Sequence, residues 1–424
     1  MNHLFTNTIN TFCLPMNKSK LYIFLFLLQL SFVGCSQNYD TLTYDLSKFD
    51  FIRLSQNRFL FAENNTSLTS FFKNLNQIIN NKSQKISILH IGDSHIQGNL
   101  FTNRIRKNIS RVFKLEVGRG IMFPYSIAGT NDCYDYSTVF TGNWQKCRNI
   151  ESDKDCKLGL TGYSVTTQDN LAAFYFKYRN DSLAFSEDFK LRLWYKKNEN
   201  YTATVEGKPS IHVNELANDL CIAEYKVTGI NKDSICVKFS RTTNQANTFT
   251  LYGFEIINDN EMIDYHSVGV NGADVTAWNN SSQLISQIEI IQANLIIISL
   301  GANDGYKKMF DEKLFFDSYN QFIEKIRTSF PNVAILLTTP GDSYQYKKQV
   351  NPNNEKIRNI TIALAKKHDC VVWDFYEIMG GLNSIKKWNE NGLSSSDLLH
   401  LSPTGYLLQG DLFFQAFMSE FEKY

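Results

Sequence analysis

The chain has 424 residues, of which 43% are hydrophobic and 20% are charged, proportions close to those of ordinary globular domains that exclude extensive disorder. It has 43 basic and 42 acidic residues, a net charge of +1 and no block of lysine and arginine, so it is not expected to bind nucleic acid. Its length allows two or three domains.

The N-terminal region contains one short apolar run, Leu21–Val33, which two lysines precede. The run is shorter than the about 20 residues that span a bilayer, but it suits the apolar part of a signal peptide. A glycine and Cys35 follow it, an arrangement similar to the lipobox of bacterial lipoproteins, whose cysteine is acylated. We therefore expect residues 1–35 to be a lipoprotein signal peptide, Cys35 to be the lipidation site and residues 36–65 to be a tether. The protein would then be an exported bacterial lipoprotein, anchored to a membrane in the periplasm or at the cell surface. Release by signal peptidase I is the alternative, because Phe32 stands where the lipobox usually has leucine.

Export would place the chain in an oxidising compartment, where disulfides form. Six cysteines follow the leader: Cys133, Cys147, Cys156, Cys221, Cys236 and Cys370. We expect one bridge among the first three, which cluster in a polar region. Cys221 and Cys236 flank a strand–turn–strand pattern and could face each other, whereas Cys370 opens an apolar strand and is expected to be a buried thiol. Fifteen pairings are possible, and the sequence fixes none of them.

Two segments of the chain, 66–157 and 258–424, show the alternation of strands and helices that is typical of a doubly wound α/β domain. The spacing of apolar residues predicts a helix over 67–80. Four nearly continuous apolar runs predict parallel strands that are buried on both faces: Ile86–Ile91, Leu295–Leu300, Val333–Thr338 and Cys370–Phe375. Helical patterns follow or separate them: Ser281–Gln292, Phe315–Phe330, Asn354–His368 and a last helix that begins at Pro403, with Ser402 as its N-cap.

The segment 158–257 differs from its surroundings. Short runs of alternating apolar and polar residues are separated by turn residues, and helical spacing is absent. This pattern predicts an antiparallel β-sandwich. We therefore expect an all-β module to be inserted between the first strand of the α/β domain and its remainder.

Four short motifs carry candidate catalytic residues. Ser94 follows a predicted strand in the motif His90–Gly98, so its hydroxyl is expected at the carboxyl edge of the sheet, where open α/β folds bind ligands. Its backbone N–H would lie near a helix N-terminus, where an oxyanion is stabilised. Gly272 lies among small residues that let a backbone N–H approach a bound group. Asn303 offers an amide donor at another strand end, and the spacing of Asp397 and His400 allows a carboxylate to orient an imidazole.

In this order, the four motifs resemble those of the SGNH (GDSL-type) hydrolase superfamily. The GDSH variant around Ser94, together with Gly118–Pro124 and Met379–Gly381, is most similar to the peptidoglycan O-acetylesterases of that superfamily. In that group, a β-sandwich resembling a carbohydrate-binding module is inserted at the position of 158–257. The resemblance implies a flavodoxin-like three-layer hydrolase domain with a parallel sheet, plus the inserted sandwich.

The resemblance also implies roles for the motif residues. Ser94 would be the nucleophile, His400 the general base and then acid, and Asp397 the carboxylate that orients His400. The oxyanion hole would consist of the backbone N–H groups of Ser94 and Gly272 and the side chain of Asn303. No cofactor is required. No metal is expected, because no acidic pair completes a ligand set around the two histidines of the first motif.

The function implied is that of a serine esterase, an O-acetylesterase that removes acetyl groups from an envelope or extracellular polysaccharide such as peptidoglycan. An acetyltransferase of the same superfamily and a non-enzymatic glycan-binding lipoprotein are the alternatives. The expected partners are an acetylated polysaccharide and, through the lipid anchor, a membrane.

Three further features each have a functional and an ordinary interpretation. His95 could line the site, and Arg119 could contact the substrate or be an ordinary arginine. Trp194, Tyr195 and Tyr201 could stack on sugars, although a place in the core is the more frequent one for such aromatic residues.

Overall fold

A computed structural model describes residues 46–63, 65–81, 84–151, 156–179, 188–228, 234–243 and 247–424. The expected signal peptide, Cys35, the first part of the tether and the turn between Cys221 and Cys236 lie outside these ranges. Within the ranges, no helix is both long and apolar enough to cross a bilayer.

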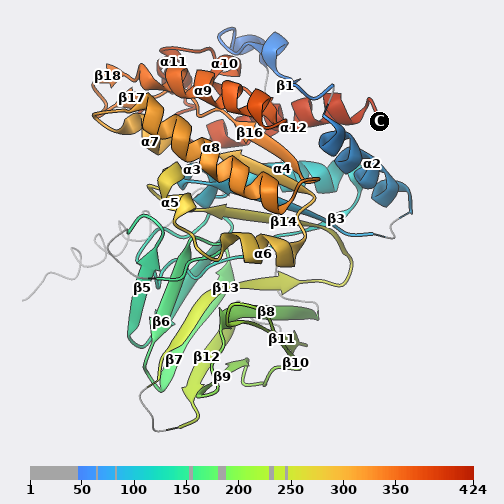
Figure 1. The fold of residues 1–424 in the computed structure, drawn as a ribbon, viewed down its shortest axis with the longest axis vertical. Helices are drawn as coiled ribbons and strands as arrows, with labels where there is room; N and C mark the ends of the chain where they lie inside the picture. The colour runs from blue at the N-terminus through green and yellow to red at the C-terminus, as the bar shows by residue number, and fades with distance from the viewer. Residues whose placement is uncertain are drawn as a thin grey trace, which may run out of the picture. The chain divides into compact units, whose positions relative to one another are not determined.

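A seven-stranded sheet forms the centre of the α/β part (Figure 1). Its order is β1-β19-β16-β15-β2-β14-β3, and every neighbouring pair is parallel except the edge pair β1–β19. The strands are β1 (Phe59–Leu60), β2 (Ile86–Gly92), β3 (Glu116–Gly118), β14 (Glu261–Gly269), β15 (Leu295–Ser299), β16 (Ala334–Thr338) and β19 (Val371–Trp373). The four predicted apolar runs therefore form the four adjacent strands β19, β16, β15 and β2.

Helices cover both faces of this sheet. Alternate residues of each strand point to opposite faces, so they enter two different cores. Leu89 and Ile91 of β2 join a core that includes α8, whereas His90 between them contacts Phe101 of α4. The long helices are α2 (Thr66–Asn81), α4 (Leu100–Phe113), α8 (Glu312–Ser329), α9 (Asn353–Lys367) and α12 (Pro403–Phe421). The shorter ones are α3 (Ser94–Gln97), α5 (Val275–Asn279), α6 (Leu284–Ile291), α7 (Ala302–Tyr306), α10 (Phe375–Ile378) and α11 (Ser384–Glu390), with 3₁₀ turns η2 (Leu46–Lys48) and η3 (Leu54–Gln56).

The helices form where the apolar spacing predicted them. Ser402 caps α12 by accepting a hydrogen bond from the backbone N–H of Gly405, and Pro403 occupies the first turn. Helix α12 packs on α4, and α8 packs on α5 and α9. These observations confirm the predicted α/β fold class.

The other part of the molecule consists of two antiparallel sheets. The six-stranded sheet has the order β10-β11-β8-β13-β6-β5, and the four-stranded sheet has the order β4-β7-β12-β9. Their strands are β4 (Tyr136–Thr141), β5 (Trp144–Arg148), β6 (Tyr163–Thr167), β7 (Leu171–Tyr178), β8 (Phe189–Lys196), β9 (Tyr201–Val205), β10 (His212–Glu215), β11 (Leu220–Val227), β12 (Ile235–Arg241) and β13 (Phe249–Ile257). A separate two-stranded ribbon, β17 (Tyr344–Gln345) and β18 (Gln349–Val350), lies after β16.

Aromatic side chains join the two antiparallel sheets. Phe174 of β7 contacts Phe254 of β13 with ring centroids 5.3 Å apart, and Phe239 of β12 contacts Phe249 of β13 at 4.7 Å. Strands β4 and β5 belong to these sheets although they precede residue 158, at which the sequence pattern placed the start of the all-β module.

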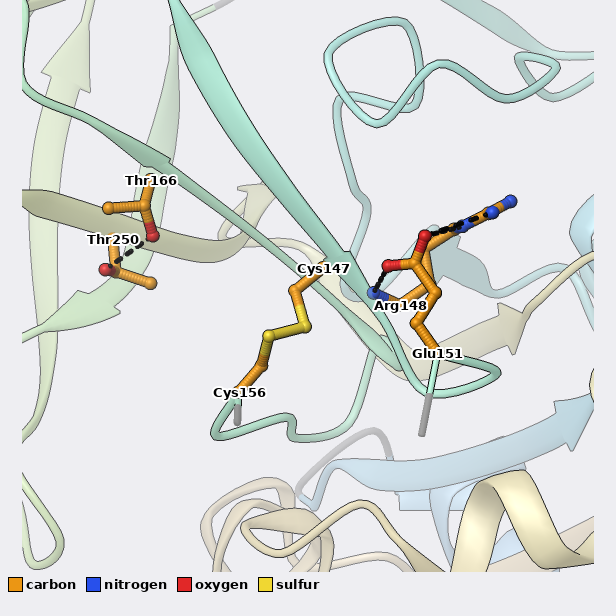
Figure 2. Close-up of a disulfide and its surroundings, with 6 residues drawn as sticks. All are labelled: Cys147, Arg148, Glu151, Cys156, Thr166 and Thr250. Carbon is orange, nitrogen blue, oxygen red and sulfur yellow. Dashed lines mark hydrogen bonds and ion pairs between the residues drawn. A yellow bond between two sulfur atoms is a disulfide. The ribbon is translucent and has the colours of Figure 1, made fainter. Parts of the chain in front are cut away.

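The cysteines follow the sequence expectation in part. Cys147 and Cys156 form a disulfide at the end of β5, beside an ion pair between Arg148 and Glu151 (Figure 2). The pairing of Cys221 with Cys236 is wrong, because β11 and β12 belong to different sheets and no disulfide joins these two residues.

Candidate active site

Ser94 is the first residue of the short helix α3, directly after the buried strand β2 and Asp93. The carboxylate of Asp93 caps this helix by accepting a hydrogen bond from the backbone N–H of His95 at 3.0 Å. The turn needs glycine at position 92, because a Cβ there would lie 2.2 Å from Cγ1 of Ile96. These local contacts place Ser94 at the carboxyl end of a central strand.

The structure brings Ser94, His400 and Asp397 into one chain of hydrogen bonds. The Ser94 Oγ lies 2.9 Å from Nε2 of His400, and Nδ1 of His400 lies 2.8 Å from Oδ2 of Asp397. Both distances are within hydrogen-bond reach for a nucleophile, its base and the group that orients the base. The arrangement allows Ser94 to pass its proton to His400 as the hydroxyl attacks an acyl carbon.

The second carboxylate oxygen of Asp397 accepts three hydrogen bonds from the surrounding loop. Its Oδ1 accepts hydrogen bonds from Ser395 Oγ at 2.6 Å and from the backbone N–H groups of Leu399 and His400, both at 2.9 Å. Partial burial raises the pKa of Asp397, but these hydrogen bonds and the one from the His400 ring lower the pKa well below its usual range. Asp397 is therefore ionised at neutral pH, and its hydrogen bonds hold the carboxylate in its orientation toward His400.

Gly272 and Asn303 lie with Ser94 and His400 around one cavity. Gly272 has a φ of 84°, a conformation that favours glycine and that directs the turn after β14. The Asn303 amide donates to the carbonyl of Ala273 at 3.0 Å and to Oδ2 of Asp93 at 3.2 Å. To donate to an oxyanion, the amide would redirect one of these two hydrogens.

This cavity has a volume of about 510 Å³ and an open mouth. Most of its lining residues are polar: Ser94, His95, Gln97, Gly98, Asn131, Asp132, Asn271, Gly272, Ala302, Asn303, Leu399, His400 and Tyr406. A smaller cavity of about 50 Å³, lined by both polar and apolar residues, shares His95, Ala302 and Leu399 with it. The arrangement thus offers a wide, mostly polar space at the Ser94 hydroxyl and a narrow one next to it.

The structure places His95 at the site and Arg119 away from it. His95 lines both cavities, its Nδ1 lies 2.8 Å from the Tyr406 hydroxyl and its ring lies 5.0 Å from that of His400, centroid to centroid. Burial and the nearby charge of His400 lower the pKa of His95 to about 3, so this ring is neutral at neutral pH. Arg119 is buried and donates to Asp135 at 3.0 Å, so it does not reach the cavity.

The aromatic residues proposed as a sugar platform belong mainly to the core. Trp194 and Tyr201 are buried, and the Trp194 indole donates to Glu255 at 2.9 Å. Tyr195 is partly buried and stacks on Phe249 with centroids 5.2 Å apart.

Several cavity residues were missed by the sequence analysis. Gln97 lay within the quoted Ser94 motif, and its position one helical turn after the nucleophile was the available signal. Asn131, Asp132 and Tyr406 carried no signal, because each comes from a segment whose approach to the site depends on the whole fold. Within the described ranges, no group of three or more histidine, cysteine, aspartate or glutamate side chains is arranged to hold a metal ion.

Comparison with known proteins gives the following relationships. Residues 233–408 match the model of the GDSL-like lipase/acylhydrolase family, a range that includes Gly272, Asn303, Asp397 and His400 and begins after Ser94. No curated protein matches the sequence.

Among solved structures, one described as a peptidoglycan O-acetylesterase in action superimposes with a TM-score of 0.68 at 19% identity, over 84% of this chain and 96% of that one. Protein YXIM of Bacillus subtilis matches at 14% identity over 72% of this chain and 98% of its own, with a TM-score of 0.33. An acetyl xylan esterase matches at 21% identity over 37% and 82% of the two chains, with a TM-score of 0.29. The last two scores are too low to carry an argument, and the first shows the fold. Residues 233–408 thus match the GDSL-like lipase/acylhydrolase family, and the chain as a whole has the fold of the SGNH hydrolases.

Proposed function

We propose that the protein is a serine esterase that removes O-acetyl groups from an envelope or extracellular polysaccharide such as peptidoglycan. The observation that carries this proposal is the chain of hydrogen bonds from Ser94 through His400 to Asp397, at the edge of an open polar cavity. Such a chain activates a hydroxyl for attack on an ester.

The reaction would proceed in two halves. In the first, Ser94 Oγ bonds to the ester carbon while Nε2 of His400 takes its proton, and His400 then returns that proton to the departing alcohol. In the second, water attacks the acetyl-Ser94 ester, His400 accepts a proton from the water, and acetate leaves as Ser94 is protonated again. Asp397 stabilises the imidazolium in each half.

Negative charge develops on the carbonyl oxygen in both halves. The backbone N–H groups of Ser94 and Gly272 and the amide of Asn303 are the donors that would stabilise it, and each oxyanion donor is worth about 10²–10³ in rate. The two backbone N–H groups are held by the protein before the substrate arrives and need little reorganisation in the transition state. The Asn303 amide would first release one of its two hydrogen bonds.

The choice of a polysaccharide rests on the cavity and on the structural relative. A space of about 510 Å³ with a mostly polar lining suits the sugar of an acetylated glycan better than a lipid chain. The structure with the same fold over 84% of the chain is described as a peptidoglycan O-acetylesterase, which supports an acetylated glycan as substrate.

We also propose that the protein is an exported lipoprotein acylated at Cys35, which would place it at the envelope. Labelling with an alkyne fatty acid tests this, and Cys35→Ala should abolish the label.

The function is tested by acetate release from O-acetylated peptidoglycan and from 4-nitrophenyl acetate. Ser94→Ala should lower kcat by about 10⁶, the usual loss for a nucleophile in such a triad. Ser286→Ala is the matched control, because this serine bonds only within its own helix region, to the Gln283 carbonyl. Equal rates for parent and Ser94→Ala would contradict the proposal. Acetylated sugar appearing when a sugar acceptor is added would instead indicate acetyl transfer, and glycan binding without turnover would indicate a binding protein.

A further inference from the structure

The side chain of Gln97 lies almost completely buried, 2% exposed, at the last position of α3. It is three residues after Ser94, and its amide makes hydrogen bonds with three other segments of the chain. A buried amide with both oxygen and nitrogen in use is costly to disturb, because each partner that it leaves is also buried or part-buried. This residue therefore connects the nucleophile turn to its surroundings.

The oxygen of the Gln97 amide holds the turn that carries Gly272. It accepts a hydrogen bond from the backbone N–H of Asn271 at 2.8 Å. Asn271 directly precedes Gly272, whose φ of 84° continues the turn into the cavity. A displacement of Asn271 would therefore move the Gly272 N–H, one of the proposed oxyanion donors.

The same oxygen accepts a second hydrogen bond from the hydroxyl of Tyr163 at 2.8 Å. Tyr163 is the first residue of β6, in the six-stranded antiparallel sheet, and is fully buried. Burial raises the pKa of Tyr163, so its hydroxyl stays protonated and remains a donor. The antiparallel part of the protein is thus bonded to the same atom that holds the Gly272 turn.

The nitrogen of the Gln97 amide fixes one wall of the cavity. It donates to the carbonyl of Asn131 at 2.8 Å and lies 3.3 Å from the Thr130 hydroxyl. That hydroxyl also accepts from the Asn271 side chain at 2.9 Å. The result is a closed set of contacts among Gln97, the Gly272 turn and the loop at Asn131.

We propose that Gln97 is a positioning residue of the active site, which holds the Gly272 turn where its N–H can meet the oxyanion and couples that turn to the antiparallel sheets through Tyr163. The inference rests on the proposed esterase function and goes beyond it, because it assigns the antiparallel part of the protein a role in the catalytic geometry. Glutamine is suited to the position because one amide supplies an acceptor for two donors and a donor for a carbonyl.

The test compares kcat and KM for 4-nitrophenyl acetate in the full-length protein. Gln97→Met keeps the length of the side chain and removes every amide bond, so the Gly272 N–H should lose its position. We expect kcat to fall about 10- to 100-fold, below the about 10²–10³-fold loss of a whole oxyanion donor, with KM within about threefold of the parent. Tyr163→Phe removes one of the two donors to the Gln97 oxygen and should lower kcat about two- to tenfold.

Gln287→Met is the matched control. Gln287 is also a buried glutamine whose oxygen accepts a backbone hydrogen bond, from Leu160 at 2.7 Å, and it likewise joins an α/β helix to the chain before β6. It lies outside the cavity lining, so its replacement should lower the melting temperature about as much as Gln97→Met while leaving kcat unchanged.

Gln97→Glu separates positioning from general destabilisation. Glutamate keeps the acceptor for Asn271 but, when ionised, faces the Asn131 carbonyl with a second oxygen instead of a donor. A protonated glutamate restores the donor, so the ratio of kcat for Gln97→Glu to kcat for the parent should rise as the pH falls from 8 to about 5.5. With both proteins folded over this pH range, as circular dichroism would verify, a role in stability alone would leave this ratio flat.

The outcomes decide the inference in both directions. A folded Gln97→Met with kcat within twofold of the parent, or an equal loss of kcat in Gln287→Met, would overturn it. If Gln97→Met does not fold, the same measurements on Tyr163→Phe and Gln97→Glu test the inference instead. It would be overturned if Tyr163→Phe had the kcat of the parent and the ratio of kcat for Gln97→Glu to kcat for the parent did not change with pH. Absence of Ser94-dependent turnover in the parent would refute the proposed function itself, which this set of variants distinguishes from a failure of the Gln97 inference.

Discussion

Ser94 and His400 are 306 positions apart in the chain, yet Oγ of one lies 2.9 Å from Nε2 of the other. The contact depends on the loop before α12, residues 394–401, whose two ends are hydrogen-bonded to each other. A bridge pairs Ser394 with Leu401, and the backbone N–H of Ser395 donates to the His400 carbonyl at 2.9 Å. The imidazole is therefore held by a tight loop against the end of β2, rather than by a flexible segment.

Asp397→Asn should abolish most of the activity while leaving the loop intact. The remaining amide oxygen can still accept from Ser395 and the two backbone N–H groups, but the amide nitrogen cannot accept from Nδ1 of His400. The ring would then carry its proton on Nε2 and could not take the proton of Ser94, so we expect kcat to fall by about 10⁴. Steady-state hydrolysis of 4-nitrophenyl acetate measures this.

Ser395→Ala is the control for Asp397→Asn, because it removes one of three donors to the same carboxylate oxygen and leaves the bond to His400. It should lower kcat less than tenfold. A comparable loss in both variants would show that the loop, and not the tautomer of His400, controls the rate.

The parts of the fold that could be predicted are those with a local signal. The runs at Ile86–Ile91 and Leu295–Leu300 are nearly continuously apolar because β2 and β15 are buried on both faces, and Ser402 with Pro403 marks the start of α12 by cap chemistry. Ser94, Asn303 and His400 were predicted to act together because they lie in motifs, and the structure places them around one cavity.

The parts that could not be predicted depend on which distant segments meet. Alternating residues identify β11 and β12 as strands, but nothing local says that they belong to different sheets, so Cys221 and Cys236 do not form the pair that their turn suggested. The role of Gln97 depends in the same way on partners from three separate segments, none of which carries a motif for it.

Asn303→Ala should lower kcat by about 10²–10³, the value of one oxyanion donor, with little change in KM. The amide is held by the Ala273 carbonyl and by Asp93, so its position does not depend on substrate. Its loss should therefore act on the transition state more than on binding. A kcat within threefold of the parent, measured with the same ester, would remove Asn303 from the oxyanion hole and leave the two backbone N–H groups.

The Cys147–Cys156 disulfide closes a short loop, with a sequence separation of 9. Constraint of the unfolded chain by a loop of this length corresponds to about 2.6 kcal/mol of stability. The free energy of unfolding of the double variant Cys147→Ser with Cys156→Ser should therefore be lower than that of the parent by about this amount, with a lower midpoint of denaturant unfolding, and reduction of the parent with dithiothreitol should give the same shift. Identical midpoints for the oxidised parent and the double variant would show that this loop is already constrained without the bond.

His90 should make the folded protein sensitive to acid. The ring is fully buried between the Tyr265 hydroxyl, 2.9 Å from Nδ1, and the Ser299 hydroxyl, 2.7 Å from Nε2. Burial and the charge of Arg106 lower the pKa of His90 from its ordinary value of 6.5 to about 3. Below pH 6.5 the unfolded chain therefore binds a proton that the folded chain does not. The contribution of this residue to stability is complete above pH 6.5 and is lost by about 1.4 kcal/mol per pH unit as the pH falls toward 3.

His90→Gln removes that titration, although it should be less stable than the parent at pH 7 because one amide cannot reproduce both ring contacts. The difference in free energy of unfolding between parent and variant should then shrink as the pH is lowered from 7 to 4.5. Only the parent has a side chain at this position that binds a proton when the chain unfolds, so only the parent loses stability through it. Urea unfolding at several pH values measures the difference. A difference that stays constant over this range would mean that folding does not lower the pKa of His90, which would contradict the expected acid sensitivity.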